Sequence, residues 1–139
     1  MRHRILATLV GLIVTVALAT PIWAHHSFSA EYDAKKPIKL TGAVTKVEWM
    51  NPHVYFYIDV RDEQTGKITN WALEMGAPAV IQRNGWTRNS MKIGDLVIVE
   101  GFQAQSGQPQ GNARTVTLAS TGQRLGAGSS FGGGNAEQQ

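Results

Sequence analysis

Apolar and polar residues alternate along the stretch HVYFYIDV, which follows Asn51-Pro52. A period of two predicts a β-strand with one buried face, because successive side chains of a strand point to opposite sides of the sheet. The buried face is predicted to consist of Val54, Phe56, Ile58 and Val60. The opposite face is predicted to carry His53, Tyr55, Tyr57 and Asp59.

Four further stretches are rich in β-branched or aromatic residues, are bounded by turn residues, and predict strands. They are IKLTGAVTKVEW (38–49), KITNWALEM (67–75), LVIVEGF (96–102) and ARTVTLA (113–119). Gly42 lies inside the first stretch and predicts a bulge or a sharp bend. Before the fourth strand, APAVIQRN has Pro78 near its start and Gly85 after its end, a pattern typical of a short helix.

Five strands with one short helix between the third and the fourth is the element order of an OB-fold. The sequence therefore predicts a mainly β protein, a small five-stranded OB-like Greek-key barrel that spans residues 38–125. Residues 25–37 form a predicted N-terminal segment in front of the barrel. The Gly- and Ser-rich residues 126–139 lack the apolar content needed to pack and are predicted to be a disordered tail.

The first 24 residues have the features of a secretory signal peptide. A positive start with Arg2 and Arg4 precedes an uncharged apolar run, and Ala24 supplies the small residue of a cleavage site. Cleavage after Ala24 makes His25 the first residue of the mature chain. We therefore expect a periplasmic or secreted protein without a stable membrane anchor after cleavage.

Charge and composition narrow the function classes. Of 13 basic residues, Arg2 and Arg4 leave with the signal peptide, so 11 remain against 10 acidic residues. This near-neutral balance argues against a nucleic-acid partner, which requires a basic patch. The chain has no cysteine, no glycine-rich phosphate loop and neither an HExxH nor a GxSxG motif. A non-catalytic binding protein is therefore favoured over an enzyme.

The paired histidines at the predicted mature N-terminus suggest a copper site. A free terminal amine and the imidazole of His25 chelate one ion from a single residue, and His26 and His53 add further nitrogen ligands. Nitrogen donors in a flat arrangement favour Cu(II). Two alternatives stay open: the histidines are incidental, or copper serves a redox enzyme with an open coordination position.

A second candidate site is an aromatic face of the barrel that binds a partner protein or a small ligand. Its predicted members are Trp49, Tyr55, Tyr57 and Trp71. Aromatic residues on the strands of an OB-fold stack against bases or sugars. The alternative is that the N-terminal segment, with Phe28 and Tyr32, packs over this face and fills it.

Glu74 stands out because it lies in an otherwise apolar strand, WALEMG. A carboxylate there must face solvent or find a partner. The sequence predicts a structural ion pair with Arg83 or Arg88.

Several long phrases of the chain resemble an uncharacterised family of small exported bacterial proteins. They are AHHSFSAEYD, VTKVEWMNPHVYFYIDV, WALEMG and GWTRNSMKIGD. The resemblance covers nearly all of the mature domain, roughly residues 25–125. The family is in turn similar to other exported bacterial OB-fold proteins. The resemblance supports the predicted fold and implies no particular activity.

Overall fold

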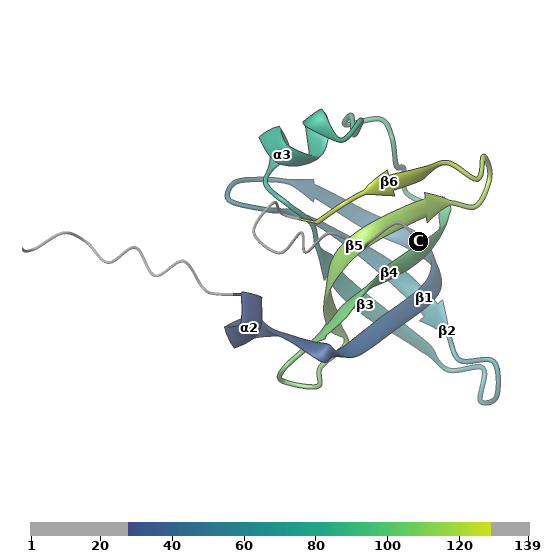
Figure 1. Ribbon diagram of the computed structural model, residues 1–139. Helices are drawn as coiled ribbons and strands as arrows, with labels where there is room; N and C mark the ends of the chain where they lie inside the picture. The colour runs from purple at the N-terminus through teal and green to yellow at the C-terminus, as the bar shows by residue number, and fades with distance from the viewer. Residues whose placement is uncertain (1–27, 129–139) are drawn as a thin grey trace, which may run out of the picture.

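A computed structural model describes residues 28–128 of the chain. Within these residues, two helices and six strands follow one another along the chain, as Figure 1 shows. The elements are α2 (Phe28–Glu31), β1 (Tyr32–Trp49), β2 (Val54–Arg61), β3 (Ile68–Glu74), α3 (Pro78–Arg83), β4 (Leu96–Ala104), β5 (Gln110–Leu118) and β6 (Arg124–Gly126). No helix within residues 28–128 is long and apolar enough to cross a membrane.

The strands form one sheet in the order β3-β2-β1-β4-β5-β6, and an additional parallel pairing of β3 with β5 closes it into a barrel. All other neighbours are antiparallel. This connectivity, with α3 between β3 and β4, is that of a small OB-like barrel and confirms the predicted fold class. The short strand β6 adds to the five that the sequence predicts.

β1 is long enough to pair with a strand in each half of the barrel. Its C-terminal part pairs with β2, and its N-terminal part pairs with β4. The two pairings overlap at Gly42, where an added Cβ would lie only 2.6 Å from the carbonyl oxygen of Asp59. The predicted first strand is present, although β1 begins at Tyr32 rather than at residue 38. Its register shifts lie between Val44 and Lys46 and between Tyr32 and Pro37, not at Gly42.

The core lies inside the barrel and is built from the predicted face of β2. Val54, Phe56 and Ile58 are fully buried, whereas Tyr55 and Tyr57 lie on the outer face. One end of the barrel is covered by α3 and the segment that follows it, which contribute Ile81, Trp86 and Met91 to the core (Figure 1). The indole nitrogen of Trp86 donates to the carbonyl oxygen of Gly126.

The C-terminal boundary of the domain differs from the sequence prediction. The backbone N–H of Ala127 donates to the carbonyl oxygen of Arg114, and its own carbonyl accepts from Gly76. Ala127 is fully buried. Placing the start of the disordered tail at residue 126 was therefore wrong, because these backbone pairs extend the ordered chain to residue 128. The rest of the predicted tail and the predicted signal peptide lie outside the described residues.

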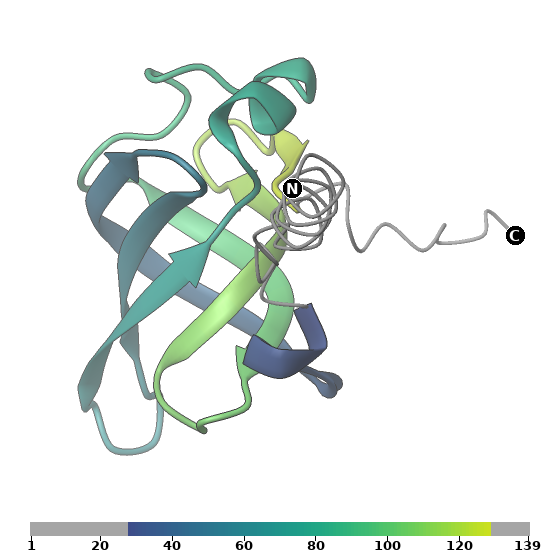
Figure 2. The ribbon, with the colours of Figure 1, turned by 90° about the vertical axis from the view of Figure 1, so that its left-hand side faces the viewer.

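The N-terminal helix α2 lies beside the turn that connects β4 to β5 (Figure 2). The Phe28 ring packs edge-on against Phe102, with 5.7 Å between centroids, and lies 5.6 Å from the ring of Tyr32. The backbone N–H of Gln105 donates to the carbonyl oxygen of Glu31. These contacts hold the start of the described chain against the barrel.

Candidate functional site: a buried carboxylate with tyrosine and histidine partners

The outer face of the barrel carries a buried carboxylate at the end of β3. Glu74 points away from the core, yet it is only 5% exposed. The reason is that Tyr55 of β2 flanks it on one side and Asn112 of β5 flanks it on the other. Tyr32, at the start of β1, reaches the same carboxylate. Three strands distant in sequence thus converge on one side chain.

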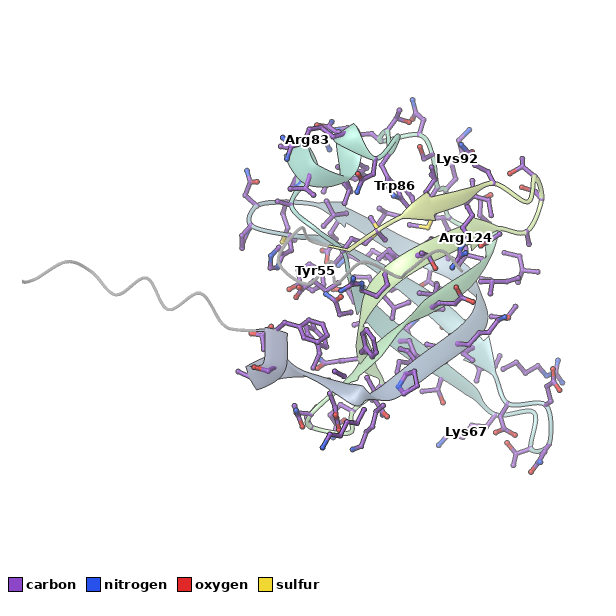
Figure 3. The ribbon with its side chains drawn as sticks, in the orientation of Figure 1. Tyr55, Lys67, Arg83, Trp86, Lys92 and Arg124 are labelled. Atoms are coloured by element: carbon purple, nitrogen blue, oxygen red, sulfur yellow. The ribbon has the colours of Figure 1, made fainter. Side chains whose placement is uncertain are left out.

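The carboxylate has partners at both oxygens. Glu74 Oε2 accepts hydrogen bonds from the hydroxyls of Tyr32 at 2.9 Å and Tyr55 at 2.8 Å. Glu74 Oε1 accepts from the Asn112 amide at 3.5 Å and lies 3.1 Å from His53 Nδ1, an ion-pair contact when the imidazole is protonated. We call these five residues the Glu74 cluster. Figure 3 labels Tyr55, the member of this cluster that comes from β2.

Burial and the carboxylate charge act together on the two phenols. Burial raises the pKa of Tyr32 far above its ordinary value. The negative charge of Glu74 is the second largest cause, and the hydrogen bond to Glu74 is the third. Burial, followed by the hydrogen bond to Glu74 and the charge of Glu74, raises the pKa of Tyr55 in the same way. Both phenols therefore stay protonated and donate to the carboxylate.

An alkaline titration tests this arrangement. The chain has three tyrosines, and the pKa of the third, Tyr57, is raised mainly by its hydrogen bond to Glu48. At the pH of about 10 at which free tyrosine ionises, we expect Tyr32 and Tyr55 of the folded protein to contribute no tyrosinate absorbance. The unfolded chain in urea is the control and should titrate there. A folded-state titration with two or more ordinary tyrosines would contradict the hydrogen bonds to Glu74.

The same shifts predict how stability depends on pH. Above about pH 10 the unfolded chain loses phenol protons that the folded protein retains, so the free energy of unfolding falls as pH rises. Below that pH the contribution of the two phenols is fully present. Urea unfolding between pH 8 and pH 11 should show this decline, and it should be weaker in Tyr32→Phe, which has no phenol to ionise. An equal decline in that variant would refute this explanation of the pH dependence.

The predicted partners of Glu74 were wrong. Neither Arg83 nor Arg88 contacts the carboxylate: the Arg88 guanidinium lies over the Trp49 ring, 5.4 Å from its centroid. Figure 3 shows Arg83 on α3, away from Tyr55. One signal in the sequence could have identified a correct partner of Glu74. The alternation along β2 places Tyr55 on the outer face, and Glu74 lies opposite Tyr55 in the β2–β3 register.

Of the three histidines predicted to bind metal, the structure describes His53. His53 follows the Asn51–Pro52 peptide, a cis bond, and its side chain is 35% exposed. His25 and His26 lie outside the described residues. Within residues 28–128, no three or more His, Cys, Asp or Glu side chains are grouped so that they could hold a metal ion.

The four residues of the predicted aromatic face do not come together. Tyr55 donates to Glu74, and Tyr57 donates to Glu48 at 2.8 Å. Trp49 and Trp71 lie on the other side of the sheet, where they pack against the core. Tyr32 also reaches the carboxylate beside Tyr55, so the N-terminal segment covers part of this surface.

A cleft opens beside the Glu74 cluster, with a volume of about 420 Å³. Tyr32, Tyr55 and Glu74 form one wall, and Glu31 of α2 also lines it. The remaining lining residues are Ala30, Ala72, Ala104, Gln105, Ser106 and Gln110. No lysine or arginine from the described part of the chain lines the cleft.

Fold and site together define a small OB-like barrel with a buried carboxylate cluster on its outer face. The chain belongs to a family of unknown function (DUF6152), whose profile matches residues 13–114. No curated protein matches the sequence. A crystal structure of a mitochondrial single-stranded DNA binding protein of S. cerevisiae, Rim1, is similar in fold, with 13% identity and a TM-score of 0.48. The similarity covers 60% of this chain and 93% of that one.

Proposed function

We propose that the protein is a soluble periplasmic binding protein that acts without catalysis and holds copper at its mature N-terminus. The ligands are the amine and imidazole of His25, with His26 and His53 as further nitrogen donors. The proposal depends on cleavage of the signal peptide after Ala24, which exposes the amine. Nitrogen donors of this kind suit Cu(II).

The observation that carries the proposal is the orientation of His53. Its Nδ1 lies 3.1 Å from the buried Glu74 carboxylate, while the side chain keeps 35% of its surface exposed. Histidines that bind metals commonly turn one ring nitrogen toward a carboxylate, which fixes the ring, and use the other nitrogen for the metal. Among the interactions of the described residues, none uses His53 Nε2.

The attachment of the N-terminal segment supports the same site. Tyr32 donates to the carboxylate that faces His53, and His26 precedes Tyr32 by only six residues. His25 precedes Phe28 by three positions, so a fully extended link between them covers about 10 Å. The Glu74 cluster thus anchors Tyr32 at the carboxylate that His53 faces, which supports a site that joins His53 to the N-terminal histidines.

A competition titration tests the proposal. Mature protein that starts at His25 is titrated with Cu(II) against a chelator of known affinity. We expect His53→Ala to weaken copper binding at least about 10-fold, and Glu74→Gln by about 10- to 100-fold, as is typical for a residue that orients a ligand. An extra alanine before His25 should weaken binding too, because it moves the amine away from that imidazole.

Glu48→Gln is the matched control, because Glu48 also accepts a tyrosine hydroxyl on the outer face but contacts no histidine. Its copper affinity should equal that of the unchanged protein. Binding no tighter than micromolar, or affinity unchanged in His53→Ala, would refute the proposed site. A melting temperature that does not change when copper is added would favour a protein-interaction module instead. Only a ligand that prefers the folded state stabilises the protein.

A further inference from the structure

The oxygens at the centre of the Glu74 cluster are spaced as the ligands of a metal ion are. The hydroxyls of Tyr32 and Tyr55 lie 2.9 Å and 2.8 Å from Glu74 Oε2. Neighbouring oxygen ligands that each lie ~2.0 Å from an octahedral ion are themselves roughly 2.8–2.9 Å apart. Each hydroxyl therefore lies as far from Glu74 Oε2 as two neighbouring oxygen ligands of such an ion lie from each other.

The surroundings of these oxygens also fit a cation. All three side chains line the cleft of about 420 Å³, which gives access and leaves room for water to complete the coordination. Glu31 places a second carboxylate in the lining. The described lining holds no lysine or arginine that would repel a cation. His53 faces the other carboxylate oxygen, Oε1, and does not line the cleft.

The donor types indicate which cation. Two phenolates and one carboxylate are hard oxygen donors, which suit hard cations rather than Cu(I) or Zn²⁺. Their three negative charges balance a trivalent ion. We propose that Tyr32, Tyr55 and Glu74 form a binding site for ferric iron that opens into the cleft. Its ligands differ from the copper ligands, although Glu74 also contacts the copper ligand His53 through its other oxygen, Oε1.

Binding is a proton-for-metal exchange. Each phenol releases its proton to solvent as its oxygen coordinates the ion, and no electron is transferred. In the metal-free protein the two protons form the hydrogen bonds to Glu74 Oε2. The hydrogen-bonded cluster is thus the apo form of the site.

Titration of the mature protein with ferric nitrilotriacetate tests the proposal. Coordination of tyrosinate to ferric iron produces a visible charge-transfer band, so we expect the protein to become coloured at one equivalent and to retain iron through desalting. Tyr55→Phe and Tyr32→Phe should each weaken binding by about 10-fold or more and diminish the band. Tyr57→Phe is the matched control and should keep both, because the Tyr57 hydroxyl donates to Glu48 and lies outside the cluster.

Two further measurements separate this site from the copper site and from misfolding. A protein with His25→Ala and His26→Ala should keep the iron band, so failure of the copper proposal leaves this result unaffected. Resonance Raman excitation in the band of the unchanged protein should enhance tyrosinate vibrations, which requires no variant. Absence of a band with no iron retained would overturn the proposal. A band that survives loss of both Tyr32 and Tyr55 hydroxyls would overturn it as well.

Discussion

Glu74→Ala is expected to lower the free energy of unfolding by about 3–5 kcal/mol. Removing one partner from a buried hydrogen-bonded network leaves the others without an acceptor, and each buried donor so stranded costs about 1–3 kcal/mol. Two of the donors, the Tyr32 hydroxyl and the Asn112 amide, belong to residues that are 8% and 3% exposed. Urea unfolding of the purified variant measures the loss.

Two further variants test whether the loss of stability is specific to the Glu74 carboxylate. Glu74→Gln keeps one acceptor oxygen for the tyrosines and should lose less stability than the alanine variant. Glu48→Ala removes an outer-face carboxylate that also accepts a tyrosine hydroxyl, but from a more exposed position, and should cost much less. If Glu74→Ala were no more destabilising than Glu48→Ala, the cluster would not stabilise the barrel as described.

Gly101→Ala is expected to destabilise the barrel by about 3 kcal/mol or more. A Cβ at this position of β4 would lie 2.0 Å from the carbonyl oxygen of Asn112 and 3.1 Å from the Cα of Ala113. These are backbone atoms of the paired strand β5, so no side-chain rotation relieves the clash. Overpacking costs about 1–3 kcal/mol where neighbours can adjust, and here the strands themselves must separate. Thermal and urea unfolding measure the change.

Gly126→Ala provides the control for this substitution. The added Cβ would have only the Asn84 amide nitrogen nearby, at 3.8 Å, and the backbone does not adopt a left-handed conformation there. A change of about 0.5 kcal/mol or less is expected, as for most exposed positions. Equal effects at Gly101 and Gly126 would contradict the close approach of β4 and β5.

The sequence predicts the barrel well where local patterns determine the structure. The alternation from His53 to Val60 places the core and outer faces of β2 as observed. Pro78 and Gly85 mark the two ends of α3. Pro78 suits the first turn of a helix, and Gly85 adopts a positive φ of 92° just after the helix ends. Each of these signals acts within a few residues, so no tertiary information is needed.

The parts that were missed depend on pairing between distant strands. Residues 32–37 are mostly polar and show no alternation, yet they extend β1. Pro37 pairs with Phe102 and Tyr32 pairs with Ala104 of β4, with a register shift between the two pairs. The three residues of β6 are too few for a periodic pattern and are ordered by pairing with β5.

The burial of Glu74 was missed for the same reason. It follows from the parallel contact of β3 with β5 and from Tyr32, 42 residues earlier, which no local pattern reveals. An acidic residue within an apolar strand signalled that some partner exists. Only the fold identifies two tyrosines, an asparagine and a histidine in place of an arginine.

The most direct test of the proposed copper function is the intact mass of the protein recovered from a periplasm supplied with copper, measured under native and denaturing conditions. One sample then reports both the first residue of the mature chain and any retained metal. The account predicts a denatured mass that begins at His25 and a native mass heavier by one copper ion. A chain that begins at another residue, or one that begins at His25 and carries no copper, would contradict it.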